Sequence, residues 1–236
     1  MRAIICGGGI AGLTAALCLH QRGWDVKVLE QAPEITEVGA GIQISPNGFK
    51  VLEALGLGTA IRHVSYEPDV IEMRMGRSGR RLMSIPMKKI ATRRWGAPYL
   101  QIHRADLITA LRVAVERQIP GAIQTGTSVT SYSQTDRAIT VRTTKDIFQG
   151  DILIGADGVR STIQAQMLGK TPARFTGAVA WRAVVPVERL TGLHIPKGAC
   201  IWAGEGRHAA IYLVRRGQLI IFVGMVVQDD WHTESW

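Results

Sequence analysis

The sequence has few of the residues that mark disulfide-rich or membrane-spanning proteins. Its three cysteines, Cys6, Cys18 and Cys200, are odd in number and widely spaced, which fits neither a disulfide framework nor a zinc site. We interpret them as reduced thiols. The longest apolar run, Leu219 to Val227, is far shorter than the roughly 18 residues that a transmembrane helix needs, and its branched side chains favour a buried strand.

Aromatic residues are also scarce. Four Phe and four Tyr occur among 236 residues, and they form no platform on which bases could stack. A net charge of +9 would suit an anionic partner, but the basic residues are dispersed except around Arg74 to Arg81 and Lys88 to Arg94. We therefore expect no nucleic-acid partner and no membrane partner. The first apolar stretch carries three successive glycines, unlike a signal peptide, so a cytoplasmic protein is expected.

The chain has enough apolar residues to form a hydrophobic core without disulfides or a structural metal. Hydrophobic residues make up 46% and charged residues 20%, which excludes a disordered chain, and the length predicts one to two domains. No metal site is expected, because each histidine lacks a carboxylate or cysteine at ligand spacing. These isolated histidines are His20, His63, His103, His194, His208 and His232.

The apolar pattern predicts an α/β fold. The N-terminus reads as strand, glycine turn, helix and strand, and a further strong helix is predicted at Ala105 to Glu116. Beyond Pro172 the pattern is that of strands separated by Gly, Pro and Arg-Gly turns. We predict a Rossmann-like FAD/NAD(P)-binding βαβ domain, residues 1–70 and 101–178, interleaved with a β-rich substrate domain, residues 71–100 and 179–236.

The segment Gly7-Gly8-Gly9-Ile10-Ala11-Gly12 satisfies the dinucleotide pattern G-x-G-x-x-G. Gly7 permits the tight turn, Gly9 lets the backbone approach a pyrophosphate, and Gly12 lets the helix pack on the strand. The phosphates would sit at the helix N-terminus. Glu30, 23 residues after Gly7, ends the next strand and would accept hydrogen bonds from a ribose. Its charge would repel a 2′-phosphate, which favours FAD or NAD over NADP without distinguishing the first two.

A second informative segment is Asp151-Ile152-Leu153-Ile154-Gly155-Ala156-Asp157-Gly158, a predicted buried strand followed by a glycine-bounded turn. Together with the N-terminal pattern it resembles the Asp-Gly motif of the single-component FAD-dependent aromatic hydroxylases, such as the salicylate and 3-hydroxybenzoate hydroxylases. Further segments match that family in order, from Met1 to the last residue. They are Gly39 to Gln43, Pro46-Asn47-Gly48, His103 to Leu107 and Trp181 to Pro186.

The resemblance implies the positions of the cofactor. Gly7, Gly9, Ala11 and Gly12 would line the FAD pyrophosphate, and Glu30 would hold the adenosine ribose. Arg104 would also contact the FAD, and Val129 would lie near the adenine. Asp157 and Gly158 would serve both the FAD and the path of the pyridine nucleotide. The loop that contains Gly41 would lie near the isoalloxazine.

The resemblance also implies the chemistry, in which NADH or NADPH reduces FAD, and O2 then supplies an oxygen atom to a small phenol or aromatic acid. The protein must orient the ring and exclude water. Within the predicted sheet, His208 and Tyr212 are four residues apart and therefore face the same side. The family places a functional His and Tyr at this spacing. His208 would assist deprotonation of the phenol, and Tyr212 would orient the substrate.

Two departures from the family bear on activity. Gln164 stands where the family usually has an arginine, and the family's Gly-Asp motif, expected beyond Trp236, is absent. We therefore expect a C-terminally truncated member with an incomplete substrate domain. Two alternatives stay open, a fragment that is inactive or binds FAD only, and an NAD-dependent dehydrogenase. The sequence also leaves open which aromatic compound is used and whether the protein forms a homodimer.

Overall fold

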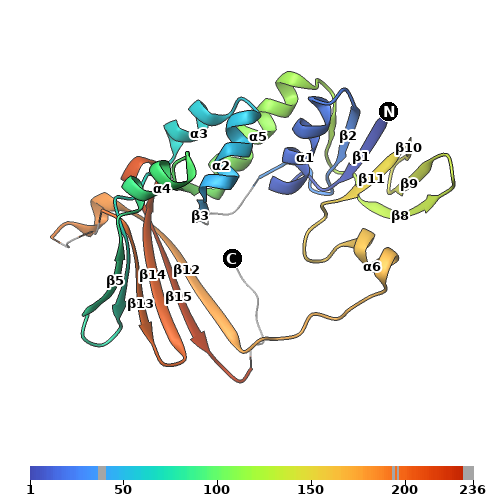
Figure 1. Ribbon diagram of the computed structural model, residues 1–236. Coiled ribbons are helices and arrows are strands. Elements are labelled where there is room, and N and C mark those ends of the chain that lie inside the picture. The colour runs from blue at the N-terminus through green and yellow to red at the C-terminus, as the bar shows by residue number, and fades with distance from the viewer. Residues whose placement is uncertain (37–40, 193–194, 196, 231–236) are drawn as a thin grey trace. The chain divides into compact units, whose positions relative to one another are not determined.

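The computed structural model describes residues 1–36, 41–192, 195 and 197–230 (Figure 1). The chain divides into two compact units. Unit 1 consists of Met1–Glu37 and Leu107–Ala173, and unit 2 of Val38–Asp106 and Arg174–Trp236. The domains expected from the sequence also interleave, but their boundaries after residues 70, 100 and 178 fall at other positions.

Unit 1 is built on a parallel sheet with the strand order β11-β1-β2-β7. Strand β1 (Arg2–Cys6) lies between β2 (Asp25–Leu29) and β11 (Ile152–Gly155), and β7 is Ile123–Gln124. The strands are short and apolar, as expected of strands that are covered on both faces. Helix α1 (Ile10–His20) joins β1 to β2 and buries Leu13 and Leu17. The strand, glycine turn, helix and strand predicted for the N-terminus are confirmed.

Two helices and a second sheet complete unit 1. Helix α5 (Arg104–Gln118) buries residues three and four apart, including Leu107, Leu111 and Val115, as an amphipathic helix does. An antiparallel sheet with the order β10-β9-β8 follows, and helix α6 is Thr162–Leu168. The strands of this sheet are β8 (Val129–Gln134), β9 (Ile139–Thr143) and β10 (Ile147–Gly150).

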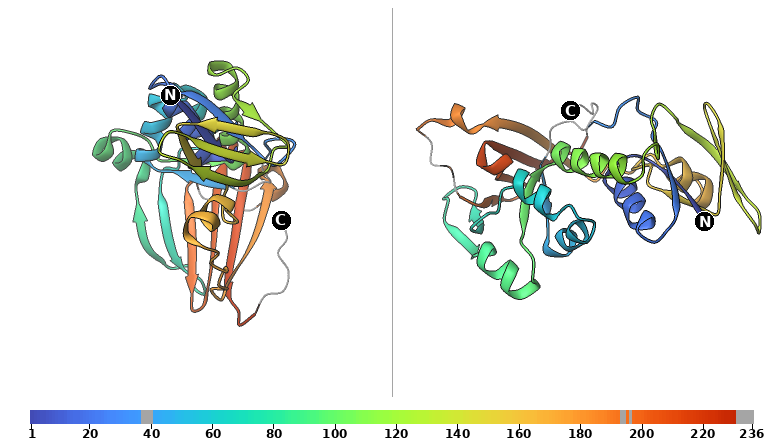
Figure 2. Two further views of the ribbon diagram at one scale, coloured as in Figure 1. Left: turned by 90° about the vertical axis from the view of Figure 1, so that its right-hand side faces the viewer. Right: turned by 90° about the horizontal axis from the view of Figure 1, so that it is seen from above.

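Unit 2 is built on a six-stranded sheet with the order β12-β15-β14-β13-β4-β5. Its long strands run side by side in Figure 1 and in the left view of Figure 2. Except for the parallel pair β13 and β4, neighbouring strands are antiparallel. The strands are β4 (Ile71–Met75), β5 (Arg81–Ile85), β12 (Ala178–Pro186), β13 (Ala199–Gly204), β14 (Arg207–Val214) and β15 (Leu219–Val227).

The register of the six-stranded sheet separates its two faces, because directly paired residues share a face and successive residues alternate. Tyr212 pairs with Ile221, and both side chains are buried in one cluster with Val214. We call this side of the sheet the Tyr212 face. The opposite face carries Trp202 and Ala209, which pair with each other, and Trp181, which pairs with Gly224.

Helices and a short ribbon accompany the sheet in unit 2. Helices α2 (Pro46–Ala54) and α3 (Gly58–Val64) follow β3 (Gly41–Ile44), which pairs with β6 (Leu100–His103). The segment 71–100, assigned as β-rich from the sequence, also contains helix α4 (Met87–Trp95). This helix buries Met87 and Ala91, one turn apart, and ends at Gly96 in the left-handed conformation.

The α/β fold class expected from the sequence is confirmed. Among the described residues no helix combines the length and the apolar character needed to cross a membrane. Within the same residues no three His, Cys, Asp or Glu side chains gather as a metal site would require.

Candidate functional site

A cavity of about 410 Å³ opens in unit 1 where its parallel strands end. Cys6 and Leu29 are the last residues of β1 and β2, and Ala156 and Asp157 follow β11. Ligands of open α/β sheets bind at this carboxyl edge. Six of the residues expected to contact FAD line the cavity: Gly7, Gly9, Glu30, Val129, Asp157 and Gly158.

The glycines of the turn after β1 differ in what would surround an added side chain. Gly7 has φ +108°, and a Cβ there would overlap the carbonyl of Ala156. A Cβ on Gly12 would overlap the carbonyl of Gly7, so Gly12 is needed for close packing of the turn. Gly9 differs, because no atom lies within 4 Å of a Cβ placed on it. Ala11 and Gly12 lie in α1 but do not line the cavity.

Glu30 accepts hydrogen bonds from backbone N–H groups near this cavity. The Gly8 N–H donates to Glu30 Oε2 at 2.6 Å, and the Ala32 N–H donates to Glu30 Oε1 at 2.8 Å. A carboxylate fixed by two backbone donors has a defined orientation and retains free lone pairs that can accept from a ribose hydroxyl. The sequence predicted the carboxylate, but not its bonds to the glycine loop.

Asp157 organises the turn after β11. Ser161 Oγ donates to Asp157 Oδ1 at 2.5 Å, and the Thr162 and Ile163 N–H groups donate to Asp157 Oδ2 at 2.7 and 3.1 Å. The carboxylate therefore satisfies backbone donors at the start of α6, which would otherwise be orphaned. This capping role explains the residue type at Asp157 without any ligand.

Cys6 lines the same cavity as an unreactive thiol. Burial, with a smaller contribution from the negative charge of Asp157, raises the pKa of Cys6 to about 12. A thiol that stays protonated is a poor nucleophile. The cavity therefore offers binding groups rather than a covalent catalyst.

The lining of the cavity fits a dinucleotide. Helix α1 begins beside it with no acidic residue in its first turn, so its unpaired N–H groups and positive dipole end are available to an anion. The open space over Gly9 would admit a pyrophosphate that any side chain there would obstruct. Glu30 can accept a hydrogen bond from a ribose hydroxyl, and Arg160 adds a positive charge to the lining.

A second group of predicted residues lies in unit 2. Gly41 begins β3 and lies against the ring of Tyr212, where a Cβ would overlap the tyrosine. Tyr212 is buried, and its side chain forms a hydrogen bond with that of Gln43. Burial raises the pKa of Tyr212 against the opposing effects of Arg182 and Gln43, so its hydroxyl stays protonated at neutral pH. Gly39 and Ala40 of the predicted isoalloxazine loop lie outside the described residues.

Tyr99 was missed by the sequence analysis. Burial, and then the charge of Tyr212, raise the pKa of Tyr99 to about 12, which places the two phenols close enough to interact. Tyr99 also lines a cavity of about 650 Å³ with Asn47, Lys50 and Trp95. Its position directly before β6, which pairs with the Gly41 strand, was the only available signal.

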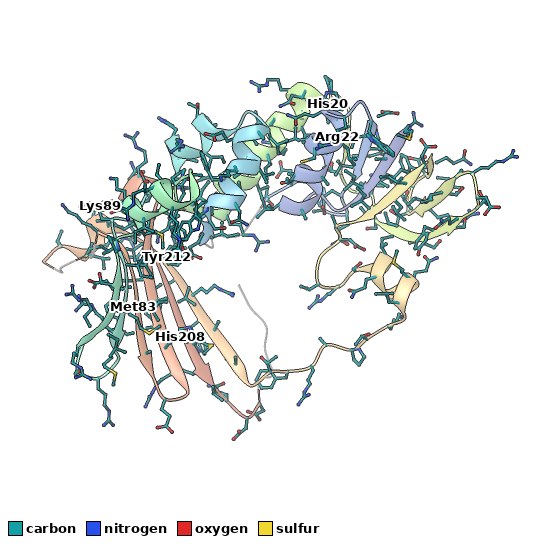
Figure 3. All side chains as sticks on the ribbon, in the orientation of Figure 1. His20, Arg22, Met83, Lys89, His208 and Tyr212 are labelled. Carbon is teal, nitrogen blue, oxygen red and sulfur yellow. The ribbon has the colours of Figure 1, made fainter. Side chains whose placement is uncertain are left out.

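His208 lies on the Tyr212 face, four residues before Tyr212 in β14, as the strand spacing predicted (Figure 3). It is half-buried and pairs with Ala203 and Met225. It also borders a hollow of about 900 Å³. Most large side chains around that hollow belong to the opposite face, including Trp181, Trp202 and Phe222. The catalytic roles of His208 and Tyr212 stay predictions.

Arg104 is the first residue of α5 and lies in unit 2. Close by in sequence, Asp106 accepts two hydrogen bonds from Arg215, from Nε and from a terminal nitrogen, both at 2.8 Å. This bidentate pair joins the start of α5 to the turn between β14 and β15. Contact between Arg104 and FAD stays a prediction.

Comparison with known proteins agrees with these observations. The family model of the FAD binding domain matches residues 1–196. A 3-hydroxybenzoate 6-hydroxylase of Polaromonas naphthalenivorans (strain CJ2) is 38% identical over 91% of this chain and 54% of the relative. A 3-amino-4-hydroxybenzoate 2-monooxygenase of Streptomyces platensis, PtnB3, is 33% identical over 100% of this chain and 59% of the relative.

A solved structure shows the same arrangement of elements. The crystal structure of Klebsiella pneumoniae HpxO with FAD and uric acid has a TM-score of 0.86 and 30% identity, covering 100% of this chain and 58% of that one. The chain thus spans little more than half the length of the relatives it matches. The resemblance to flavin-dependent aromatic hydroxylases is confirmed, and the chain belongs to the FAD binding domain family.

Proposed function

We propose that this protein is an FAD-dependent monooxygenase that hydroxylates a small phenol or aromatic acid with NADH or NADPH and O2. The observation that carries the proposal is the cavity at the carboxyl edge of the parallel sheet, whose glycine turn, helix N-terminus and Glu30 match the parts of an FAD nucleotide. The relatives with hydroxylase and monooxygenase names support the reaction class.

In this proposal unit 1 binds the nucleotide end of FAD. The first N–H groups of α1 bind the pyrophosphate over Gly9, Glu30 accepts from the adenosine ribose, and Val129 contacts the adenine. Ala11 and Gly12 act through the shape of the turn, and Asp157 holds the turn that ends in α6. Arg104 adds a further contact to FAD. When bound, the flavin supplies the activated oxygen that attacks the ring.

The Tyr212 face of unit 2 is proposed to bind the substrate. Tyr212 and Tyr99 keep their protons at neutral pH and can donate hydrogen bonds to a substrate oxygen. An imidazole nitrogen of His208 takes the proton of the substrate phenol, which raises electron density on the ring carbons ortho and para to it. One oxygen atom of O2 enters the ring and the other leaves as water, with two electrons from NADH or NADPH.

The proposal also covers the location, the partners and the domains of the protein. The protein would act in the cytoplasm on a soluble aromatic compound, with no nucleic-acid or membrane partner, either as a monomer or as a homodimer. The domains proposed from the sequence, FAD-binding in residues 1–70 and 101–178 and substrate-binding in 71–100 and 179–236, assign these roles along the chain.

The experiment that tests the function uses the purified chain with added FAD. We expect visible flavin absorbance to stay with the protein after gel filtration. We also expect NADH or NADPH oxidation to rise when 3-hydroxybenzoate is added, and the product to gain one labelled oxygen atom from isotopically labelled O2. His208→Ala should lower kcat by about 100-fold, the usual contribution of a general base, without weakening FAD binding.

The alternatives give different results. A protein that retains FAD but forms no labelled product with any phenol would be an FAD-binding protein without this activity. Oxidation of an alcohol by NAD in a colourless, flavin-free protein would indicate a dehydrogenase. An unchanged kcat in His208→Ala would refute the role of that residue while leaving the reaction class intact.

A further inference from the structure

The proposed function leaves one cavity of unit 2, of about 650 Å³, without a ligand. Helices α2 and α4 and the segment before β6 form this cavity, so its described lining lies within unit 2 alone. We call it the Trp95 cavity. Its volume falls in the range of about 300–1,000 Å³ that is typical of small-molecule sites. Its lining includes Asn47, Lys50, Met87, Arg94, Trp95 and Tyr99.

The apolar part of the Trp95 cavity consists of Met87 and two aromatic side chains. Trp95 ends α4 and is 42% exposed, whereas Tyr99 is half-buried and Met87 is buried. An indole that lines a cavity and is not packed in the core presents a flat apolar surface to a ligand. Nucleobases stack on such surfaces, because every base has a π-face.

Two cations line the same cavity. Lys50 lies on α2, and its Nζ is 3.8 Å from the position of a Cβ built on Gly96, the residue that follows α4. Arg94 directly precedes Trp95, and its guanidinium carbon lies 5.6 Å from the centre of the Trp95 ring. Both positive charges are therefore at the C-terminal end of α4, beside the indole.

The polar groups of the Trp95 cavity suit an anion. The part of the lining that the structure describes contains no Asp or Glu. Glu53, one turn from Lys50 on α2, forms its ion pair with Arg62 instead. Asn47 Oδ1 accepts a hydrogen bond from Ser45 Oγ at 2.5 Å, so the NH2 group of Asn47 is the end that can donate to a ligand.

Two phosphates joined to a flat ring fit this arrangement. Phosphate oxygens pair well with an ammonium and with a guanidinium. Because Lys50 and Arg94 come from different helices, a diphosphate can bind one cation with each phosphate, whereas a single ring carboxylate offers one charged group. The proposed reaction uses such a molecule, since NADH and NADPH both contain adenosine 5′-diphosphate. Tyr99 also interacts with Tyr212, so a nucleotide in the Trp95 cavity borders the Tyr212 face.

We propose that the Trp95 cavity binds the adenosine diphosphate part of NADH or NADPH. The adenine stacks on Trp95, Lys50 and Arg94 bind the two phosphates, and the NH2 group of Asn47 donates to a ligand oxygen. This inference rests on the proposed function, because that function requires the pyridine nucleotide. The FAD nucleotide and the reductant then have separate sites, one in each unit.

The test measures binding of adenosine 5′-diphosphate (ADP) by isothermal titration calorimetry with saturating FAD, which occupies the cavity of unit 1. We expect ADP to bind at least 10-fold more tightly than adenosine, which lacks the phosphates. Lys50→Gln and Arg94→Gln should each weaken ADP binding by about 10-fold or more, as loss of a charge-assisted hydrogen bond does, and should leave adenosine binding unchanged. Trp95→Ala removes the stacking surface and should weaken binding of both probes by about 10-fold.

Lys89→Gln and Arg93→Gln are the matched controls. Both residues are exposed on α4 and carry the same charges, but neither lines the Trp95 cavity; Figure 3 labels Lys89. ADP should bind both control variants as it binds the unaltered protein. An equal loss of ADP binding in the controls would reveal a general effect of charge and would overturn the proposal.

ADP binding that saturating FAD abolishes, or that Lys50→Gln and Trp95→Ala leave unchanged, would also overturn it. Turnover separates these failures from failure of the proposed function. In an active protein, Lys50→Gln should raise the KM for the pyridine nucleotide by about 10-fold and leave the KM for 3-hydroxybenzoate unchanged. An active monooxygenase without that rise would refute the site alone. ADP binding that depends on Lys50 and Trp95, in a protein that forms no hydroxylated product, would retain the nucleotide site and refute the monooxygenase.

Discussion

Gly12 and Gly9 of the glycine turn should respond differently to the addition of a single methyl group. Gly12→Ala places a Cβ into the carbonyl of Gly7, so the turn must open. We expect a loss of stability of about 2 kcal/mol or more and a Tm lower by several degrees. Gly9→Ala meets no atom within 4 Å and keeps an allowed φ of −77°, so the Tm should hardly change.

The same two variants separate folding from cofactor binding. Because the methyl of Gly9→Ala projects into the space assigned to the pyrophosphate, its affinity for FAD should fall by about 10-fold or more while the fold persists. Thermal denaturation without FAD and fluorescence titration with FAD are the two measurements. Normal FAD affinity in a fully folded Gly9→Ala protein would move the pyrophosphate away from this residue.

His103 makes stability depend on pH on the acidic side. Burial, and then the positive charge of Arg215, lower the pKa of His103, while Asp106 partly opposes them. As pH falls through about 6.5 the unfolded chain takes up this proton first, so stability present at neutral pH is lost. We expect a loss of about 1 kcal/mol or less between about pH 7 and 5.

Urea unfolding at both pH values measures this effect, and His103→Gln is the informative variant because it cannot titrate. The difference between the two pH values should shrink in His103→Gln. Nδ1 of His103 has no hydrogen-bond partner within the part of the chain that the structure describes, so His103→Gln breaks no hydrogen bond at that atom, and the pH difference within each protein, not its absolute stability, is the quantity compared. An identical pH dependence in both proteins would assign it to other groups.

At the scale of an element, α6 depends on its cap. A helix of seven residues is too short to persist by itself, and it is held by Ser161 Oγ, which accepts from the Gln164 N–H at 2.9 Å and donates to Asp157. Ser161→Ala should cost about 1 kcal/mol and speed hydrogen exchange across residues 162–168. Ser133→Ala, in strand β8 of the same unit, is the control and should leave that exchange unchanged.

Helix α5, whose apolar period is clear, was predictable from the sequence, whereas helix α4 was not. The stripe of Leu107, Leu111 and Val115 predicted α5, because its apolar period extends over several turns. Helix α4 has only two buried residues, Met87 and Ala91, among many charges, and was assigned to a β-rich segment. Its flanking Pro86 and Gly96 were the signal that could have corrected this.

Some residues of the candidate site were predictable from the sequence, and others were not. Gly7, Gly9 and Glu30 belong to one short sequence pattern. The spacing of its residues is typical of a strand, turn and helix that bind a dinucleotide, so these residues were predictable from the sequence. Arg182 lies on the Tyr212 face because β12 pairs with β15 and β15 with β14, and Tyr99 interacts with Tyr212 from the residue before β6. No local sequence pattern contains that information, because it depends on how parts of the chain that are distant in sequence pack together.

At the scale of the whole molecule, both units bury groups that resist ionisation. Burial raises the pKa of Cys6 in unit 1 from 9.0 to about 12, and that of Tyr99 in unit 2 from 10.0 to about 12. A raised pKa means that the folded state keeps its proton longer than the unfolded chain. The stability from these groups is therefore complete below about pH 9 and is lost as pH rises towards 12.

We expect alkaline destabilisation to come from both units. Urea unfolding at about pH 8 and 10.5 should show a loss of the order of a few kcal/mol. Cys6→Ala should remove the contribution of Cys6 in unit 1, Tyr99→Phe that of Tyr99 in unit 2, and the double variant should reduce the dependence more than either single variant. Since the two residues lie in different compact units, their effects should add. If either single variant abolished the whole effect, alkaline unfolding would be controlled by one unit, contrary to the burial of an ionisable group in each.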